Sequence, residues 1–210
     1  VTYGSSVATA LPFTANAPAI HAAIDRLHEG GVTDMESGVR RAYQLATEAR
    51  ARGEQVRVVL FTDTQPNVGA TAPSDFEQMV AEGARAGVGM TVLGLGLGMG
   101  PEILQSMAHL RGGNAFSLVS DADVAAFMND DFSWFVSPLA FDLTVALRPD
   151  AGLAVDTPYG FPVGFGADPT LRAASVFLSK RKGALLVSLA GDEAALAGFG
   201  ADLALSWVTP

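Results

Sequence analysis

Apolar runs alternate with segments of helical spacing along the first part of the chain. The apolar runs predict buried strands over residues 56–61, 89–95 and 115–119, and a short strand over residues 7–13. Apolar residues three and four apart predict a helix over residues 19–27. Capping boxes at residues 33–36 and 74–77 predict helices over residues 33–52 and 74–86. Further helices are predicted over residues 101–110, with proline in the first turn, and over residues 121–134. This alternation predicts βαβ crossovers, and hence an α/β fold with a doubly wound, mainly parallel sheet.

The pattern changes near Ser137-Pro138. Beyond this point strand-like runs follow one another, separated by turns rich in Gly and Pro such as residues 157–160, with one short helical segment near residues 193–197. The predicted strands cover residues 141–147, 171–178, 184–189 and 203–207. We therefore predict two domains, an α/β domain over residues 1–136 and a smaller, mostly-β module over residues 137–210. Both ends of the chain look cut, so we expect the α/β domain to be truncated at its amino end and the β module to be incomplete.

Composition narrows the classes of function. The net charge of −9 argues against a nucleic-acid backbone as the main partner. The absence of cysteine excludes disulfides, thiolate metal sites and cysteine nucleophiles. The apolar runs are far shorter than the roughly 20 residues of a membrane-spanning helix. Hydrophobic residues make up 49% of the chain, which predicts a folded chain with a core.

Two polar loops are the strongest candidates for chemistry. The strand over residues 56–61 ends abruptly in Thr62-Asp63, and Gly30-Gly31-Val32-Thr33-Asp34 opens a helix upstream. Open α/β sheets place their ligands at the carboxyl ends of their strands, where Asp63 is expected.

The order of several short motifs over residues 1–135 resembles von Willebrand factor A-type domains. These motifs are GG-x-T at residues 30–33, T-D-x-x-P-N at residues 62–67, Gly94-Leu95-Gly96 at a strand end, and Gly112-Gly113 before a strand. The resemblance implies a six-stranded sheet with the first strand in the middle, followed by a D-x-S-x-S loop. That loop is absent here, so we expect the first strand upstream of Val1. Without it, we expect these residues to fold poorly, to close the gap by non-native pairing, or to take a strand from elsewhere.

The resemblance implies a non-enzymatic interaction or adhesion module with a Mg²⁺-dependent surface. Thr33 would supply a hydroxyl and Asp63 a carboxylate to the metal, and an Asp or Glu of a protein partner would take an open position. One departure is Thr64, which stands where the family usually has Gly. The arrangement resembles that of bacterial cell-envelope or secreted proteins.

Other readings of these residues stay open. Thr33 could act only as a helix N-cap, with Glu36 completing a capping box, and Asp63 could act only as a turn former. The domain would then be a metal-free structural scaffold. A hydrolase or nucleotide-binding enzyme is the third alternative, although residues 94–100 fail the G-x-G-x-x-G spacing and no P-loop or nucleophile elbow is present.

Overall fold

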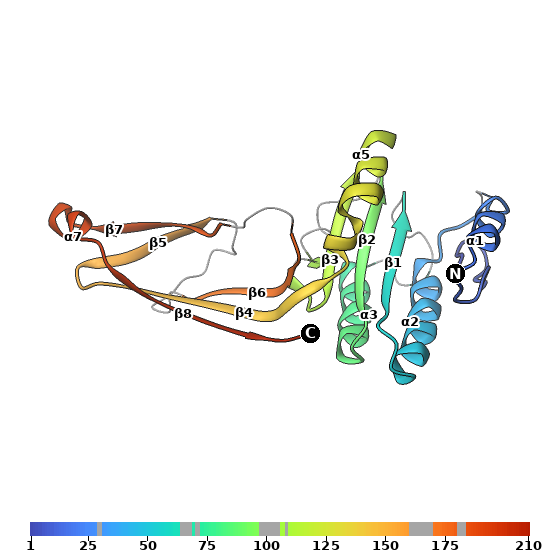
Figure 1. Cartoon of the computed structure of the whole chain (residues 1–210), viewed down its shortest axis with the longest axis horizontal. Helices are drawn as coiled ribbons and strands as arrows, with labels where there is room; N and C mark the ends of the chain where they lie inside the picture. The colour runs from blue at the N-terminus through green and yellow to red at the C-terminus, as the bar shows by residue number, and fades with distance from the viewer. Residues whose placement is uncertain are drawn as a thin grey trace. The chain divides into compact units, whose positions relative to one another are not determined.

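The fold was examined in a computed structural model of the whole chain. The structure describes residues 1–28, 31–63, 69, 72–96, 106–107, 109–159, 170–179 and 184–210. Two compact units are present, Val1–Asp130 and Asp131–Pro210, and each is described separately below (Figure 1).

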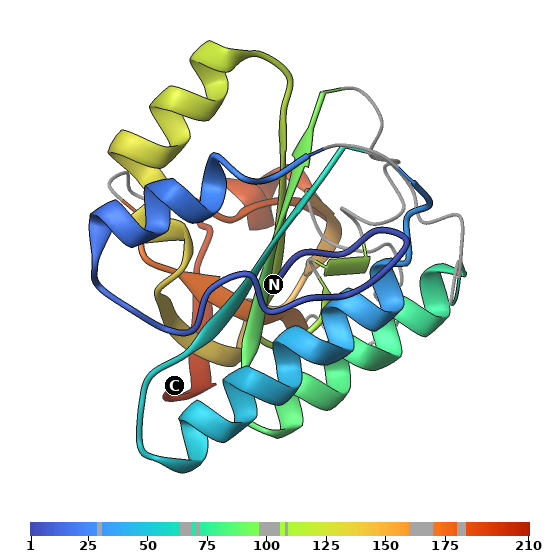
Figure 2. The ribbon, with the colours of Figure 1, turned by 90° about the vertical axis from the view of Figure 1, so that its right-hand side faces the viewer.

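The first unit has a three-stranded parallel sheet in the order β1-β2-β3. Helices α2 and α3 cover one face of this sheet and α5 lies on the other, as the edge-on view in Figure 2 shows. This arrangement confirms the predicted α/β fold with a parallel sheet. The elements are α1 (Ala17–Ile24), α2 (Met35–Ala51), β1 (Arg57–Thr62), α3 (Pro73–Arg85), β2 (Gly89–Leu95), β3 (Gly113–Leu118) and α5 (Asp121–Ala126).

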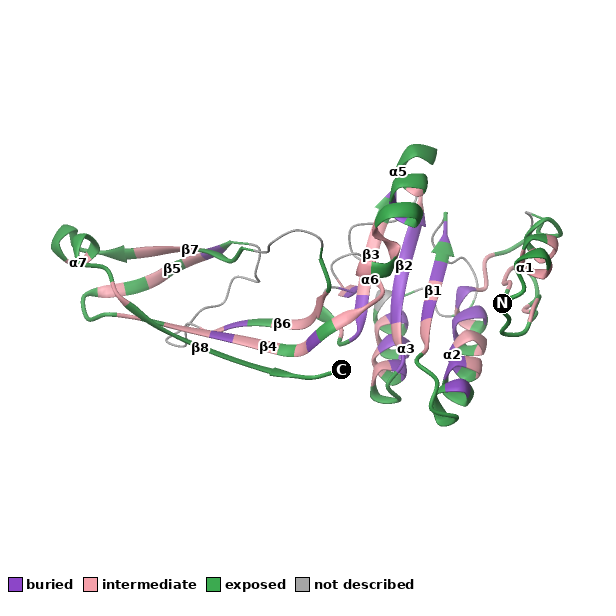
Figure 3. Ribbon diagram, in the orientation of Figure 1, coloured by how far each residue is buried: buried purple, intermediate pink, exposed green. Residues whose placement is uncertain are grey.

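The core of this unit lies between the sheet and helices α2 and α3 (Figure 3). Strand β2 is buried almost throughout because it has a strand on each side, as its nearly continuous apolar sequence predicts. The helices contribute apolar residues at helical spacing, such as Met35, Val39 and Tyr43 from α2 and Met79 and Val80 from α3.

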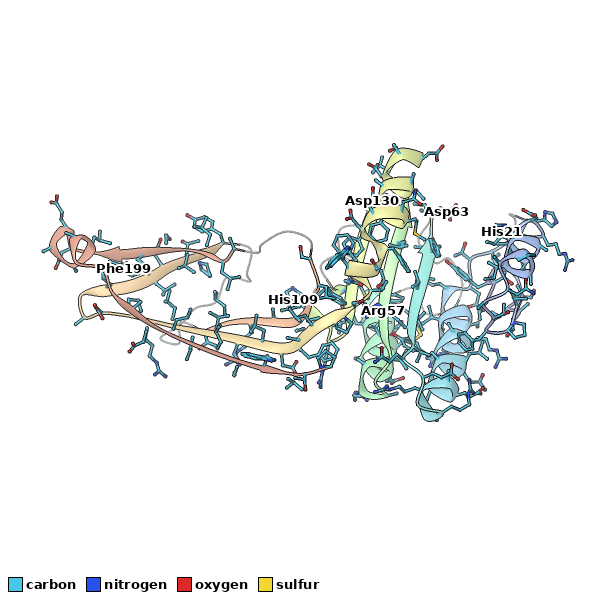
Figure 4. All side chains as sticks on the ribbon, viewed as in Figure 1. His21, Arg57, Asp63, His109, Asp130 and Phe199 are labelled. Carbon is cyan, nitrogen blue, oxygen red and sulfur yellow. The ribbon has the colours of Figure 1, made fainter. Side chains whose placement is uncertain are left out.

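Arg57, which is labelled in Figure 4, links the amino ends of the three strands by hydrogen bonds. From β1, its Nε donates to Thr91 Oγ1 on β2 at 2.7 Å, and its Nη2 donates to the Met90 carbonyl at 2.8 Å. The same Nη2 donates to the Gly112 carbonyl at 2.8 Å and to Asn114 Oδ1 at 2.9 Å, at the start of β3. Burial lowers the pKa of Arg57 to about 10, so the side chain stays charged at neutral pH.

The second unit is made mostly of β-strands, which form two antiparallel sheets. One sheet has the order β6-β4-β8 and the other pairs β5 with β7. The β4–β8 pairing shifts register between Phe141 and Thr144, where Asp142 adopts a left-handed φ of 49°, as expected of a β-bulge. The elements are a π-helical turn (Phe127–Asp131) that joins the two units, then α6 (Phe132–Phe135), β4 (Pro138–Pro149), β5 (Leu153–Tyr159), β6 (Thr170–Phe177), β7 (Leu186–Gly191), α7 (Glu193–Ala197) and β8 (Ala201–Val208).

Several local predictions were wrong. The strand predicted over residues 7–13 is reduced to one isolated bridge between Thr2 and Ala8, because no neighbouring strand extends the ladder. The helix predicted over residues 121–134 is interrupted by the π-helical turn. Strand β5 was missed because Pro158 reads as a turn residue, yet it lies in a two-stranded sheet, in which both strands are edges and Pro is tolerated. Most of the helix predicted over residues 101–110 lies outside the described residues.

Replacing Arg57 with Met should destabilise the chain by about 2 kcal/mol, because buried oxygens on β2 and β3 lose their donor. Urea denaturation followed by circular dichroism measures this change. Arg52→Met is the matched control, since Arg52 makes an exposed ion pair with Glu54 at 2.8 Å and should cost less than about 0.5 kcal/mol. Equal denaturation midpoints for the two variants would show that Arg57 does not hold the strands together.

Candidate functional site

Asp63 follows the last residue of β1, as the sequence predicts. Thr62 is buried at the end of the strand, whereas Asp63 is exposed beyond it (Figure 4). The strands are parallel, so the ends of β2 and β3 lie at this same edge. Residues 64–68, which include Thr64 and the Pro66-Asn67 pair, lie outside the described residues.

Thr33 lies in the loop before α2, but it is not the N-cap of that helix. Asp34 takes this role, because its carboxylate accepts a hydrogen bond from the Ser37 backbone N–H at 3.0 Å. This hydrogen bond lowers the pKa of Asp34 below its usual value. Thr33 is therefore not the cap predicted for this helix, which is the next residue, and Thr33 itself is half-buried. The second predicted capping box, at residues 74–77, is also wrong, because α3 begins at Pro73 after Ala72.

The loops after β1 and before α2 come close together at Gly69. A Cβ atom at this position would lie 3.1 Å from Asp34 Oδ1 and 3.1 Å from Glu36 Oε2. Gly69 also has a φ of +78°, which side chains other than glycine rarely adopt. Glycine therefore lets the chain that leaves β1 pass against the beginning of α2.

Thr33 and Asp63 both line one groove of about 1290 Å³. The groove also runs along β1, α2, α1 and the amino-terminal segment, and its apolar lining includes Phe13, Leu27 and Phe61, which are exposed. In the described part of the chain β1 pairs with β2 alone, so no strand lies on its other side there.

Tyr3 connects the amino-terminal segment to this edge of the sheet. Its hydroxyl donates to the Phe61 carbonyl at 2.7 Å. Burial raises the pKa of Tyr3, and the negative charge of Asp63 raises it further. No motif in the sequence singles out Tyr3, so its place at the groove could not have been predicted.

The oxygen donors of the groove fit part of a Mg²⁺ site. A hydroxyl from Thr33 and a carboxylate from Asp63 are suitable hard ligands, and Mg²⁺ commonly keeps several waters. Asp34 is engaged as the helix cap, and Glu36 makes an ion pair with Arg40 at 2.8 Å. Among the described residues no group of three or more acidic or histidine side chains forms a complete metal cluster. The described residues thus include two candidate metal ligands but not a complete ligand set.

Two histidines of the first unit, His21 and His28, are both exposed, and His28 lies at the groove. Most of the glycine-rich stretch at residues 94–100 lies outside the described residues.

The sequence profile of the von Willebrand factor type A domain matches residues 1–65, which include both Thr33 and Asp63. Over these residues the chain is similar to the von Willebrand factor type A family. Domains of this family generally mediate protein–protein interaction. Residues 1–65 therefore carry both the family match and the two candidate ligands.

Relatives of this chain are much longer proteins. The uncharacterized protein YfbK of Escherichia coli is 30% identical over 151 residues, which cover 70% of this chain and 26% of YfbK. The pig inter-alpha-trypsin inhibitor heavy chain H4 is 29% identical over 120 residues, which cover 54% of this chain and 13% of the heavy chain. A von Willebrand factor type A structure from Catenulispora acidiphila aligns with 91% of this chain and 50% of its own, at 14% identity and a TM-score of 0.48.

None of the helices in the described ranges has the length and apolar character needed to cross a membrane.

The capping assignment makes Asp34, and not Thr33, important for stability. Asp34→Ala should lower the melting temperature at neutral pH, and Thr33→Val should change it much less. Because the pKa of Asp34 is lowered in the native state, its contribution is present above the ordinary aspartate value of about 3.9 and is lost as the pH falls below it. Thermal unfolding of both variants at several pH values measures this. A larger loss for Thr33→Val would contradict the assignment.

Proposed function

We propose that this chain is a protein-interaction module that binds an acidic site of a partner protein through Mg²⁺ held at Thr33 and Asp63. The observation that carries the proposal is the placement of these two residues. They come from separate loops, yet both line one long groove that runs beside β1, and Asp63 follows the carboxyl end of this strand of the parallel sheet. The carboxyl edge is the usual ligand position in open α/β sheets.

A metal ion held by Thr33 and Asp63 would be suited to bind a carboxylate of a partner protein. Asp63 would give the metal a carboxylate ligand and Thr33 a neutral hydroxyl, so a single protein carboxylate leaves net positive charge at the site. A partner Asp or Glu is the natural ligand for that charge, because hard cations select oxygen anions. The acidic character of the chain as a whole, with a net charge of −9, would make such a bridge depend strongly on the metal.

We further propose that the module acts by binding and not by catalysis. The sequence has no cysteine and no G-x-S-x-G nucleophile elbow or P-loop, so three common routes to hydrolysis or phosphoryl transfer are missing. The groove lining is rich in apolar residues, which suits recognition of another protein surface.

A metal-free scaffold is the second candidate. It is favoured by the small number of ligands, since Asp34 is used as a helix cap and the described residues contain no complete metal cluster. In this case the apolar groove or the β module would make the contacts.

Binding to immobilised peptides that carry a single Asp or Glu separates the two candidates. If the metal bridge exists, binding requires Mg²⁺, is removed by EDTA, and falls by about tenfold or more in Asp63→Ala. Asp75→Ala is the matched control, because Asp75 is an exposed carboxylate on α3, away from the groove lining. Binding that persists in EDTA and in Asp63→Ala would support the scaffold.

A further inference from the structure

Residues 2–8 form a closed loop, which we call the amino-terminal loop. Thr2 N–H donates to the Ala8 carbonyl at 2.9 Å, and Ala8 N–H donates to the Thr2 carbonyl at 3.1 Å. These two bonds make the isolated antiparallel bridge between Thr2 and Ala8. Because the ends of the segment are joined, a residue that fixes one part of the loop also restrains the rest of it.

Tyr3 attaches the amino-terminal loop to the carboxyl end of β1. Its hydroxyl donates to the carbonyl of Phe61, which lies two residues before Asp63. Burial raises the pKa of the Tyr3 hydroxyl, a hydrogen bond with Thr62 lowers it, and the charge of Asp63 raises it. The hydroxyl therefore lies beside the last residues of the strand, next to one candidate metal ligand.

Ser5 attaches the same loop to the segment that carries Thr33. The N–H of Val32, the residue before Thr33, donates to Ser5 Oγ at 3.3 Å. Gly31 has a φ of +87°, and a Cβ atom there would collide with Ser5 Oγ. Glycine at residue 31 thus permits both the backbone conformation and the close approach of the serine.

Helix α2 gives the amino-terminal loop a surface to pack on. Tyr3 lies against Gly38 of this helix, where a Cβ atom would come within 2.6 Å of Tyr3 Cβ and 2.8 Å of Tyr3 Cγ. Just beyond the loop, Thr9 Oγ1 accepts a hydrogen bond from Arg41 Nε of α2 at 3.2 Å. The loop is therefore held against the helix that Thr33 precedes.

We propose that Tyr3 and Ser5 are positioning residues, which hold the end of β1 and the Thr33 segment in a fixed relation to each other. The two candidate ligands come from separate segments, and the amino-terminal loop is bonded to both. This inference rests on the metal site proposed for Thr33 and Asp63. A metal ion is bound tightly when the ligands are already held at the required separation, so residues behind the ligands affect its affinity.

Mn²⁺ titration of the full 210-residue chain, followed by NMR line broadening, tests this role. Tyr3→Phe and Ser5→Ala each remove one hydroxyl, and each should weaken Mn²⁺ binding by about threefold to tenfold, the effect of one hydrogen bond. The double variant should be little weaker than either single variant, because the loss of one attachment already separates the two segments. Circular dichroism identifies a temperature at which every variant is folded.

Tyr43→Phe is the matched control for these titrations. It makes the same change at a buried hydroxyl for which the described residues provide no hydrogen-bond partner, and it should leave Mn²⁺ affinity unchanged. Losses that add up in the double variant, or an equal affinity in Tyr3→Phe, Ser5→Ala and the unmodified chain, would overturn the positioning role.

Amide chemical shifts of the metal-free chain separate this inference from the proposed function. Ser5→Ala should move the signals of Thr62 and Asp63, and Tyr3→Phe should move those of Val32 and Thr33, although each substitution removes a bond to the other segment. If these cross-effects appear but the unmodified chain does not bind Mn²⁺, the metal site is wrong and the positioning role stands. If the chain binds Mn²⁺ at Thr33 and Asp63 without the cross-effects, the positioning role is overturned and the metal site stands.

Discussion

The parallel pairing of β1, β2 and β3 is the constraint on which the first unit depends. Since the three strands run in one direction, their amino ends share one edge of the sheet and their carboxyl ends share the other. Arg57 of β1 holds the amino edge by bonding to oxygens on β2 and at the start of β3. The opposite edge carries the carboxyl ends of the strands. Asp63 lies at this edge because β1 ends at Thr62, the residue before it.

Much of this arrangement could be predicted from the sequence, because it follows from local pattern. The nearly continuous apolar run of β2 indicates a strand covered on both faces, and the spacing on α2 indicates a helix with one buried side. Features that depend on a distant partner were not predictable. A strand over residues 7–13 would need a neighbour that the described chain does not provide, and β5 tolerates Pro158 only because both of its sheet's strands are edges.

In the candidate site, too, the features set by local sequence were predictable and those set by distant partners were not. That Asp63 lies at the end of a buried strand and Thr33 at the start of a helix could be read from their sequence contexts. Whether Thr33 or Asp34 caps α2 could not, because this depends on where the backbone enters helical geometry. The role of Tyr3 could not be predicted from the sequence either, because its hydrogen bond to the Phe61 carbonyl joins residues far apart in the chain. The convergence of these residues on one groove is a property of the fold and not of any motif.

The central claim is that Thr33 and Asp63 together hold a divalent metal. The most direct test is a titration of the isotopically labelled chain with Mn²⁺, which replaces Mg²⁺ and broadens the NMR signals of nearby nuclei. The account predicts selective broadening of the amide signals of residues 31–34 and of Thr62 and Asp63, reversed by excess Mg²⁺. Broadening confined to other acidic positions, such as Asp121 and Asp123 on α5, or no selective broadening at all, would contradict it.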